Sequence, residues 1–310
     1  MANPVSEALV TLGRGYLRRA SGPPLALAKA SLAARHLNSH LMDHPRRRVV
    51  DTAFGARFAV DTTDLIQRYI YLFGVWEPHM TAWLRRRLRP GDGFVDVGAN
   101  IGYFSVLASQ LVGEAGRVTA IEASPLFHGR LLRHARLNRC GNLRAVNTAV
   151  SDSHKTLEFV LASSHNMGAN SIVPYDGTAE STFEIEAVPL PEVLEPAEIA
   201  NARVIKIDVE GAEGGVVRGM VPMLDLIRPD AEITVEVTPD RMAQLGDCAD
   251  ELLETMRSHG FNVYRLVNEY SPESYSEALR RAPRIPVRQR GPIVGESDLI
   301  FSRVDADTLA

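Results

Sequence analysis

The chain of 310 residues is long enough to bury a sizeable hydrophobic core, which favours one large domain with appendages over two equal domains. Its 45% hydrophobic and 23% charged residues are ordinary for a globular protein, and the net charge of −4 gives no general sign of nucleic-acid binding. We find no apolar run of membrane-spanning length and no signal-peptide core, so we expect a cytoplasmic protein. Cys140 and Cys248 lie far apart without histidines at ligand spacing, and we expect buried free thiols rather than a disulfide or a zinc site.

The first 48 residues are basic, with eight arginines or lysines and two acids. Helix-like patterning over 14–20 and 24–42 is broken at Gly22-Pro23-Pro24, and 47–60 has the pattern of a short hairpin. We therefore expect residues 1–62 to form a basic N-terminal arm or helical cap. Three roles remain open for it: a helical lid or dimerisation segment, a solvated tail, and a patch for an anionic substrate or a membrane surface.

Residues 63–305 are predicted to form the main domain, beginning with two helical pieces over 64–88 that are separated at Pro78. Strands are predicted at 93–97, 117–121, 142–147, 203–208, 231–237, 261–266 and 297–303, and helices at 102–112, 124–138, 212–223 and 241–258. This alternation predicts an α/β fold with a doubly wound, largely parallel sheet of seven strands. The last strand should be antiparallel, because 271–296 lacks a helix-length pattern between the last two strands. The stretch 153–202 interrupts the alternation, and we expect an inserted hairpin over the carboxyl edge of the sheet.

The run from Phe94 to Tyr103 has the pattern of the first strand, turn and helix of a nucleotide-type fold, in which ligands bind at the carboxyl ends of the strands. A dinucleotide fingerprint needs a second glycine where this chain has Asn100, and Asp96 would repel a pyrophosphate. A cationic ligand without phosphates suits the turn better. S-adenosylmethionine is such a ligand.

Several residues are candidates for binding this cofactor. The turn supplies Asp96 for the amino group of the methionine part, and its glycines permit close approach. Glu122, which closes the next strand, is placed to accept both ribose hydroxyls, and Asp152 is a candidate acceptor for the adenine amine. The complete candidate set is Asp96, Gly98, Ala99, Asn100, Gly102, Glu122, Ala149, Val150 and Asp152.

Four stretches together resemble the FkbM family of S-adenosylmethionine-dependent methyltransferases. They are FVDVGANIGYFS at 94–105, IEASP at 121–125, AVSD at 149–152 and KIDVEGAE at 206–213. The resemblance covers roughly 65–303 and implies a Rossmann-like, class I methyltransferase fold. It also implies methyl transfer to hydroxyls of sugars, polyketides or related natural products. The family's usual Leu-Asp-Asp-Leu-like stretch is replaced here by Leu190-Pro191-Glu192-Val193-Leu194.

Two acids follow the fourth predicted strand, on the acceptor side of the methyl group. Asp208 and Glu210 end an otherwise apolar strand, where burying a carboxylate is costly unless it has a partner, so we expect at least one to act on the acceptor as base or orienting group. Glu236 ends the next strand, and Asp208 with Glu236 could hold a Mg²⁺ ion, although no Asp-x-Asp or histidine spacing supports a metal. Glu213 belongs to the first turn of the following helix, where the helix dipole favours an acid.

His165 is the histidine most suited to act as a base, because its polar loop in the inserted segment should overhang the site. His128 and His134 fall on the helix predicted over 124–138 and are expected at the surface. The alternative for His165 is a solvated loop residue.

These features predict a bacterial O-methyltransferase that acts on a saccharide or secondary-metabolite hydroxyl. The excess of 31 arginines over three lysines is typical of a GC-rich bacterial genome. Asp208-Val209-Glu210-Gly211 stands where nucleic-acid amine methyltransferases often carry an [Asp/Asn]-Pro-Pro-aromatic stretch, so no nucleic-acid partner is expected. Two alternatives stay open: an N- or carboxyl-methyltransferase on a small metabolite, and a non-catalytic cofactor-binding subunit. A homodimer is also left open.

Overall fold

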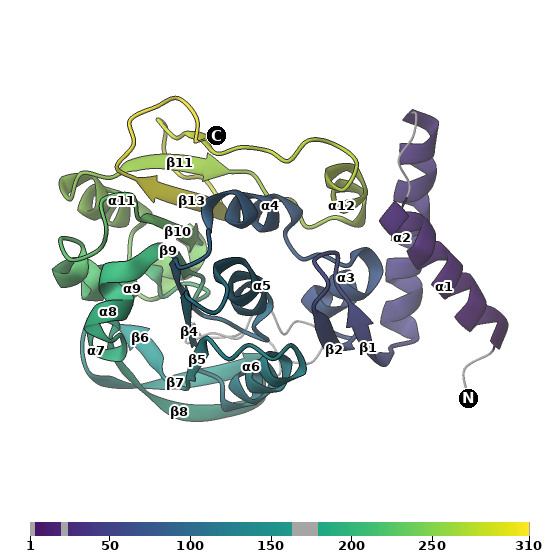
Figure 1. The fold of residues 1–310 in the computed structure, drawn as a ribbon, viewed down its shortest axis with the longest axis horizontal. Coiled ribbons are helices and arrows are strands. Elements are labelled where there is room, and N and C mark those ends of the chain that lie inside the picture. The colour runs from purple at the N-terminus through teal and green to yellow at the C-terminus, as the bar shows by residue number, and fades with distance from the viewer. Residues whose placement is uncertain (1–3, 20–23, 163–178, 310) are drawn as a thin grey trace. The chain divides into compact units, whose positions relative to one another are not determined.

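The computed structural model describes residues 4–19, 24–162 and 179–309, and these form two compact units (Figure 1). The N-terminal unit consists of the described residues of 1–82 together with 268–284. The sheet unit consists of the described residues of 83–162, 179–267 and 285–309. None of the described helices has the length and apolar character needed to cross a membrane.

The N-terminal unit is held together by helices and one hairpin. Its elements are α1 (Pro4–Arg19), α2 (Pro24–Asp43), β1 (Arg47–Asp51), β2 (Arg57–Asp61), α3 (Leu65–Phe73), the start of α4 (Pro78–Arg87) and α12 (Pro272–Ala278). The predicted hairpin is confirmed as the antiparallel pair β1–β2. The break before Pro78 is confirmed as well, because α3 ends at a left-handed Gly74 and α4 begins at the proline.

The sheet unit is built around one large sheet in the order β12-β11-β13-β10-β9-β3-β4-β5 (Figure 1). Its strands are β3 (Gly93–Val97), β4 (Arg117–Ile121), β5 (Leu143–Val146), β9 (Ala202–Ile207), β10 (Glu232–Val237), β11 (Asn262–Leu266), β12 (Val287–Arg288) and β13 (Ser297–Ser302). All seven predicted strands are present, and the two-residue edge strand β12 is an addition. The last strand is confirmed as antiparallel, since β13 lies between β10 and β11 and runs against both. The predicted doubly wound α/β fold is thereby confirmed.

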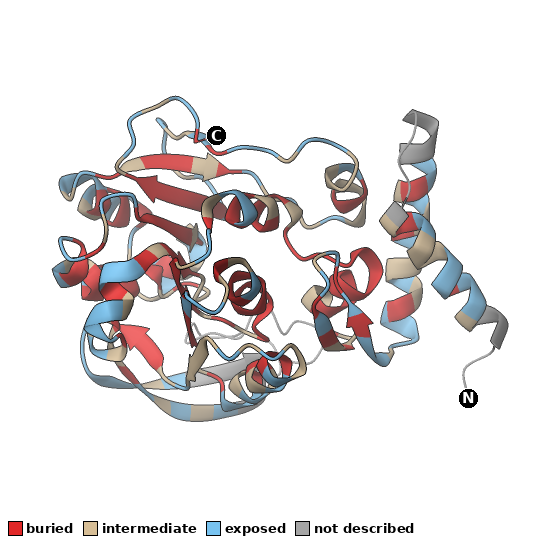
Figure 2. Ribbon diagram, in the orientation of Figure 1, coloured by how far each residue is buried: buried red, intermediate tan, exposed pale blue. Residues whose placement is uncertain are grey.

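The two faces of the sheet are covered by different helices. On one face α5 (Tyr103–Val112) packs over β3 and β4, where Ser105 bonds to Asp96 of β3. It also reaches β9, because the Phe104 ring lies 5.0 Å from the Lys206 ammonium. On the other face Val216 of α9 (Glu213–Met220) and Leu252 of α11 (Ala249–Ser258) join one buried hydrophobic cluster with the strands. Figure 2 shows the central strands as the most buried part of this unit. Strand residues therefore alternate between two buried faces, as expected in a parallel sheet covered by helices.

Helix boundaries follow local chemistry. Ser124 caps α6 (Pro125–Leu137), which has Pro125 as its first residue. The single helix predicted over 241–258 is wrong, because α10 (Pro239–Gln244) ends before Gly246, which has a left-handed φ of 77°, and α11 starts afresh. Similarly, α9 gives way to the 3₁₀ turn η2 (Val221–Met223) at Pro222.

The interrupting stretch supplies two strands of a second, three-stranded sheet, whose third strand precedes it. Its strands are β6 (Ala149–Ser151), β7 (Lys155–Ala162) and β8 (Ala179–Pro189), in the order β6-β8-β7. β7 and β8 pair antiparallel, with Lys155 opposite Ala187. The short helices α7 (Leu190–Val193) and α8 (Pro196–Asn201) then lead the chain back into β9 of the main sheet.

Two expectations about exposure are wrong. His134 is 1% exposed rather than at the surface, and its Nδ1–H donates to the carbonyl oxygen of Ile101 at 2.8 Å. Cys248 is exposed and Cys140 is partly buried, although both are free as predicted. The histidine is pulled inward because its polar ring supplies a partner for a carbonyl of the β3–α5 turn.

Candidate functional site

The turn between β3 and α5 adopts backbone conformations that only certain residues tolerate. Gly98 and Gly102 have φ values of 81° and 82°, and Asn100 between them has a φ of 51°. Left-handed backbone is accessible to glycine and, less readily, to asparagine, and the Asn100 side chain supports it by accepting a 2.8 Å hydrogen bond from the Ile101 amide. The left-handed backbone of this turn therefore explains why these positions hold glycine and asparagine.

Glu122, at the end of β4, is bonded to this turn. Its two carboxylate oxygens accept hydrogen bonds from the amides of Asn100 and Ser124, at 2.7 Å and 2.8 Å. Burial, which leaves the residue 6% exposed, raises the pKa of Glu122 to about 7 even though both amides act to lower it. Each oxygen still has a free lone-pair direction that a hydroxyl donor could use.

Asp96, at the end of β3, is a buried carboxylate with only one oxygen hydrogen-bonded. The Ser105 hydroxyl donates to Oδ2 at 2.5 Å, whereas Oδ1 has no hydrogen-bond partner among the described residues, and Asp96 is 1% exposed. Burial raises the pKa of this carboxyl, against the opposing effect of the Lys206 ammonium. An unsatisfied buried carboxylate oxygen is costly, and the ammonium group of a ligand would satisfy it.

The residues predicted near adenine have two different surroundings. Ala149 and Val150 are buried in β6. The Asp152 carboxylate is bound by Lys155 and Arg218, both at 3.0 Å, and these cations contribute to lowering its pKa to about 2. Arg218 also binds Asp247, so Asp152 belongs to an ion-pair network; its contact with adenine stays a prediction.

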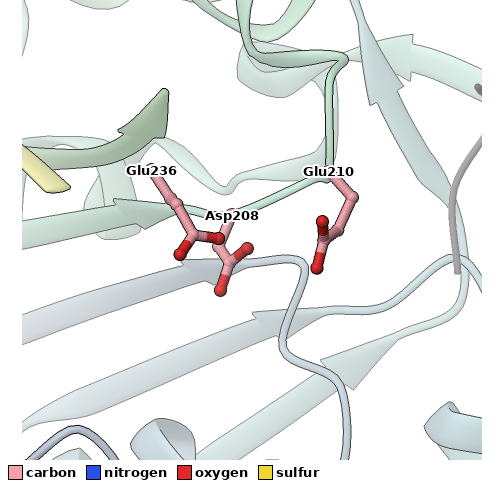
Figure 3. A group of neighbouring side chains, drawn as sticks. All are labelled: Asp208, Glu210 and Glu236. Carbon is pink, nitrogen blue, oxygen red and sulfur yellow. The ribbon is translucent and has the colours of Figure 1, made fainter. Parts of the chain in front are cut away.

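The acids predicted on the acceptor side form a row across neighbouring strands, on the face covered by α5. Asp208 directly follows β9, Glu236 lies in β10, and Asp298 of β13 is the register partner of Glu236. Figure 3 shows the Asp208 and Glu236 carboxyl groups side by side, with Glu210 reaching toward them from the turn after β9. Ligand atoms of Asp208, Glu210 and Glu236 lie within 4.8 Å of one another.

Lys206 gives this row its asymmetry. Its ammonium lies 2.7 Å from Asp208 Oδ2, with the lysine side chain only 6% exposed, and it lowers the pKa of Asp208 against the effect of burial. Burial and the charges of Asp208 and Asp298 raise the pKa of Glu236 well above its usual value. The two carboxyl groups are hydrogen-bonded, and we assign the proton to Glu236 and the negative charge to Asp208.

Glu210 has a cationic partner of its own. It is bound by Arg241 of α10, has a left-handed φ of 57°, and its pKa is raised to about 8 by burial and by Asp208. Glu213 begins α9 and accepts a 2.8 Å hydrogen bond from the Gly211 amide, as its position in the first turn predicted. Each of the three candidate metal ligands therefore already has a partner: Lys206 for Asp208, Arg241 for Glu210, and Asp208 for Glu236.

The turn at Gly98 and the acid row are in direct contact. A Cβ added at Gly98 would lie 1.8 Å from the carbonyl oxygen of Asp208, and the Asp208 amide donates to the Val97 carbonyl at 3.0 Å. The sequence therefore predicted two groups of residues that the structure brings together at the carboxyl edge of the sheet. His165 lies outside the described residues, and its role stays a prediction.

Sequence reasoning missed Lys206, Arg241, Ser105 and Asp298. Lys206 carried a usable signal, because residues two apart on a strand share a face and a lysine in an apolar strand next to an aspartate predicts an ion pair. Arg241 and Asp298 are brought in by α10 and by the antiparallel β13, and nothing in their local sequence links them to Glu210 or Glu236.

The family model for the FkbM methyltransferase domain matches residues 96–263, which is more than half of the chain. The chain belongs to the FkbM methyltransferase family. It is an S-adenosylmethionine-dependent methyltransferase with the class I fold, as the resemblance predicted. The matched FkbM region begins at Asp96 and includes the Gly98 turn, Glu122 and the acids of β9 and β10.

The FkbM chain is also similar to one curated enzyme, the hexuronic acid methyltransferase AglP of Haloferax volcanii. The two sequences are 25% identical over 223 residues, which cover 70% of this chain and 88% of that protein. Among solved structures, a putative rRNA methylase from Clostridium thermocellum aligns with a TM-score of 0.43 at 10% identity, covering 73% of this chain and 94% of its own. Precorrin-6y C5,15-methyltransferase from Geobacter metallireducens aligns with a TM-score of 0.39 at 15% identity, covering 72% and 85%.

Proposed function

We propose that this enzyme transfers a methyl group from S-adenosylmethionine to a hydroxyl group of a saccharide. The observation that carries the proposal is the Asp208 carboxyl group, which lies 2.7 Å from the Lys206 ammonium on a residue whose backbone carbonyl packs against the turn at Gly98. The Lys206 ammonium helps to hold the pKa of Asp208 below its usual value, which favours the ionised form. An alcohol must lose its proton as it is methylated, and a fixed carboxylate next to the cofactor turn can accept that proton.

The residues around the β3–α5 turn fit the cofactor. The unpartnered Asp96 Oδ1 would accept from its ammonium group, and Glu122 would accept from its ribose hydroxyls. The bound cofactor supplies an activated methyl group on a positively charged sulfur. The carboxylates at this edge of the sheet favour such a cation electrostatically, and they disfavour the phosphates of a dinucleotide.

The protein's contribution to the reaction is then mainly positioning and proton removal. Lys206 keeps Asp208 ionised, and Glu236 keeps the Asp208 carboxylate oriented through their hydrogen bond. Asp208 would accept the hydroxyl proton as the new C–O bond formed and the methyl carbon–sulfur bond of the cofactor broke, with S-adenosylhomocysteine as the leaving group. The Arg241–Glu210 pair borders this position and supplies further polar groups for a hydroxyl-rich acceptor.

A saccharide acceptor is supported by the relationship to the hexuronic acid methyltransferase of Haloferax volcanii. The carboxylate and amine acceptors that remain as alternatives differ in their chemistry. Methylation of a carboxylate acceptor needs no base, and methylation of an amine leaves a titratable product nitrogen.

Acceptor profiling with S-adenosylmethionine labelled in its methyl group tests the proposal. The purified enzyme is incubated with panels of hexoses, hexuronic acids, amines and carboxylic acids, and the labelled product is treated with mild base. We expect base-stable labelled ethers of saccharides. Label recovered as volatile methanol would identify a methyl ester and contradict hydroxyl methylation, and label only on amines would contradict it as well.

A further inference from the structure

The N-terminal unit contains a cavity of about 210 Å³. Its walls come from residues 77–79 at the start of α4, from 268–269 after β11, and from α12 with the residues that follow it (Figure 1). None of the lining residues belongs to the cofactor turn or to the acid row. Pockets for drug-sized ligands have volumes of roughly 300–1,000 Å³, so this smaller cavity suits an occupant of the size of one sugar or one amino acid.

His79 supplies a hydrogen-bond donor to this cavity. The residue lines the cavity and is only 8% exposed. Its Nδ1 accepts a hydrogen bond from the Arg284 amide at 3.2 Å, which leaves the hydrogen of the neutral ring on Nε2. Burial and the Arg284 charge lower the pKa of His79, against the opposing charge of Glu269, so the ring is neutral near pH 7. Nothing among the described residues accepts a hydrogen bond from Nε2, and a donor that is left without a partner in such a place is costly.

Glu77 supplies an acceptor to the same cavity. The residue is 3% exposed, and the Tyr270 hydroxyl donates to its Oε1 at 3.3 Å. The Glu77 amide donates to the Tyr275 hydroxyl at 3.0 Å, and its φ of 40° is a left-handed conformation that is uncommon for a glutamate. These contacts fix the position of a carboxylate, which accepts hydrogen bonds but does not donate them when it is ionised. The cavity therefore combines a fixed acceptor with a fixed donor.

The charged residues of the cavity disfavour an anionic ligand. Arg281 binds Glu277 at 2.5 Å and Arg284 binds Glu269 at 2.9 Å, so both lining arginines already have carboxylate partners. Because Glu77 adds a third carboxylate, the lining contains three acids against two arginines. A phosphate or a carboxylate entering the cavity would therefore be repelled.

We propose that this cavity binds a neutral sugar unit. A sugar carries several hydroxyl groups that both donate and accept, so one of them can donate to the Glu77 carboxylate while another accepts from His79 Nε2. Pro78, Tyr275 and Ala278 supply apolar surface for the carbon atoms of the sugar ring. An organic ammonium ion suits Glu77 but not His79, which presents a hydrogen where the ion would need a lone pair. The proposal goes beyond methyl transfer, because this binding requires neither the cofactor nor Asp208.

Saturation-transfer NMR on the full chain, without any methyl donor, tests this site. The probes are glucose, galactose, mannose, rhamnose and xylose, with choline as the cationic comparison and acetate as the anionic one. We expect saturation transfer from the protein to at least one of the sugars, with a Kd of about 1 mM, and none to choline or acetate.

Two substitutions test whether the sugar occupies this cavity. Ala278→Leu places a larger side chain in the cavity wall and should weaken sugar binding about tenfold or more. His79→Asn keeps an acceptor for the Arg284 amide but removes the Nε2 donor, and it should weaken binding about tenfold. Ala8→Leu is the matched control, because Ala8 is an exposed helical residue of the same unit that does not line the cavity, and this variant should bind sugar as the wild type does. Melting curves from circular dichroism establish that each variant is folded.

Three results would overturn the proposal. The first is wild-type protein that transfers saturation to none of the five sugars at about 50 mM. The second is undiminished sugar binding by the folded Ala278→Leu or His79→Asn variant. The third is tighter binding of choline than of any sugar, which would assign the cavity to a cation. Because no methyl donor is present, failure of this test leaves the proposed methyl transfer untouched, and failure of acceptor profiling leaves this site untouched.

Discussion

The carboxyl groups of Asp208 and Glu236 lie side by side and interact, and we assign one shared proton to Glu236 because the pKa of Glu236 is raised while that of Asp208 is lowered. Lys206 determines which carboxyl is ionised, because its ammonium lies 2.7 Å from Asp208 and lowers the pKa of Asp208, whereas the pKa of Glu236 is raised. This arrangement gives the site a carboxylate with a fixed orientation and a neutral neighbour that does not repel the acceptor.

Glu236→Gln should keep turnover within about threefold of the wild type, because the glutamine amide donates to Asp208 as the protonated glutamate does. Glu236→Leu removes that donor and should lower turnover by about tenfold or more. If the acids instead bind Mg²⁺, the glutamine variant would lose activity and EDTA would abolish wild-type turnover. Steady-state rates of the three proteins, with and without EDTA, distinguish the two readings.

Asp208→Asn should depress turnover by about a hundredfold while cofactor affinity changes by less than about threefold, because the side chain keeps its shape but no longer accepts a proton. Turnover is measured under saturating substrates, and cofactor affinity by calorimetry with S-adenosylhomocysteine. Wild-type turnover in this variant would remove Asp208 from the mechanism.

Asp96→Asn should weaken S-adenosylmethionine binding about tenfold or more, since the amide lacks the charge that attracts an ammonium group. The same change should leave the ligand-free protein as stable or more stable, because it removes a buried carboxylate oxygen that has no partner among the described residues. Thermal unfolding with and without cofactor measures both effects. A large fall in the melting temperature without ligand would contradict this account of Asp96.

Cofactor affinity should rise with pH through about 7, the raised pKa of Glu122, because the ionised form accepts ribose hydroxyls more strongly. A carboxyl whose pKa is raised on folding favours the folded protein below its usual pKa, and this stabilisation is lost as the pH rises through 7. Cofactor affinity and ligand-free stability should therefore change in opposite directions between pH 5 and 8. Glu122→Gln does not titrate, so subtracting its pH profile from that of the wild type isolates the contribution of Glu122.

Gly98→Ala should destabilise the protein by about 3 kcal/mol or more, because its Cβ would meet the Asp208 carbonyl oxygen at 1.8 Å and the backbone cannot move aside cheaply. Gly91 is a matched control with a left-handed φ of 92° and nothing within 4 Å of an added Cβ, so Gly91→Ala should cost only about 1–2 kcal/mol. Urea unfolding compares the two variants. Equal losses of stability would contradict the close contact.

The sequence was sufficient to predict the sheet, because each strand is a short apolar run followed by a turn and a helical period. The seven strands and the antiparallel β13 were all predicted. Two helix boundaries were wrong where Gly246 and Pro222 interrupt otherwise continuous patterns. A glycine or proline can end a helix even where the apolar helical pattern continues past it, and the sequence alone does not reveal which effect prevails.

The site residues that could be predicted from the sequence are those at or near the ends of strands. Asp96, Glu122, Asp208 and Glu236 could be placed at one edge because the carboxyl ends of parallel strands meet there. Partners that arrive from elsewhere could not be placed: Arg241 comes from a separate helix and Asp298 from an antiparallel strand. The exposure of His134 was mispredicted for a related reason, since its partner Ile101 lies in another element.

The position of β13 has a consequence for biosynthesis. This strand is made last of those in the large sheet, yet it inserts between β10 and β11 and brings Asp298 next to Glu236. While a ribosome is still translating residues 297–302, the growing polypeptide lacks the strand that joins the two parts of the sheet. The surroundings of Glu236 are thus completed only when this strand has been made and has paired with β10.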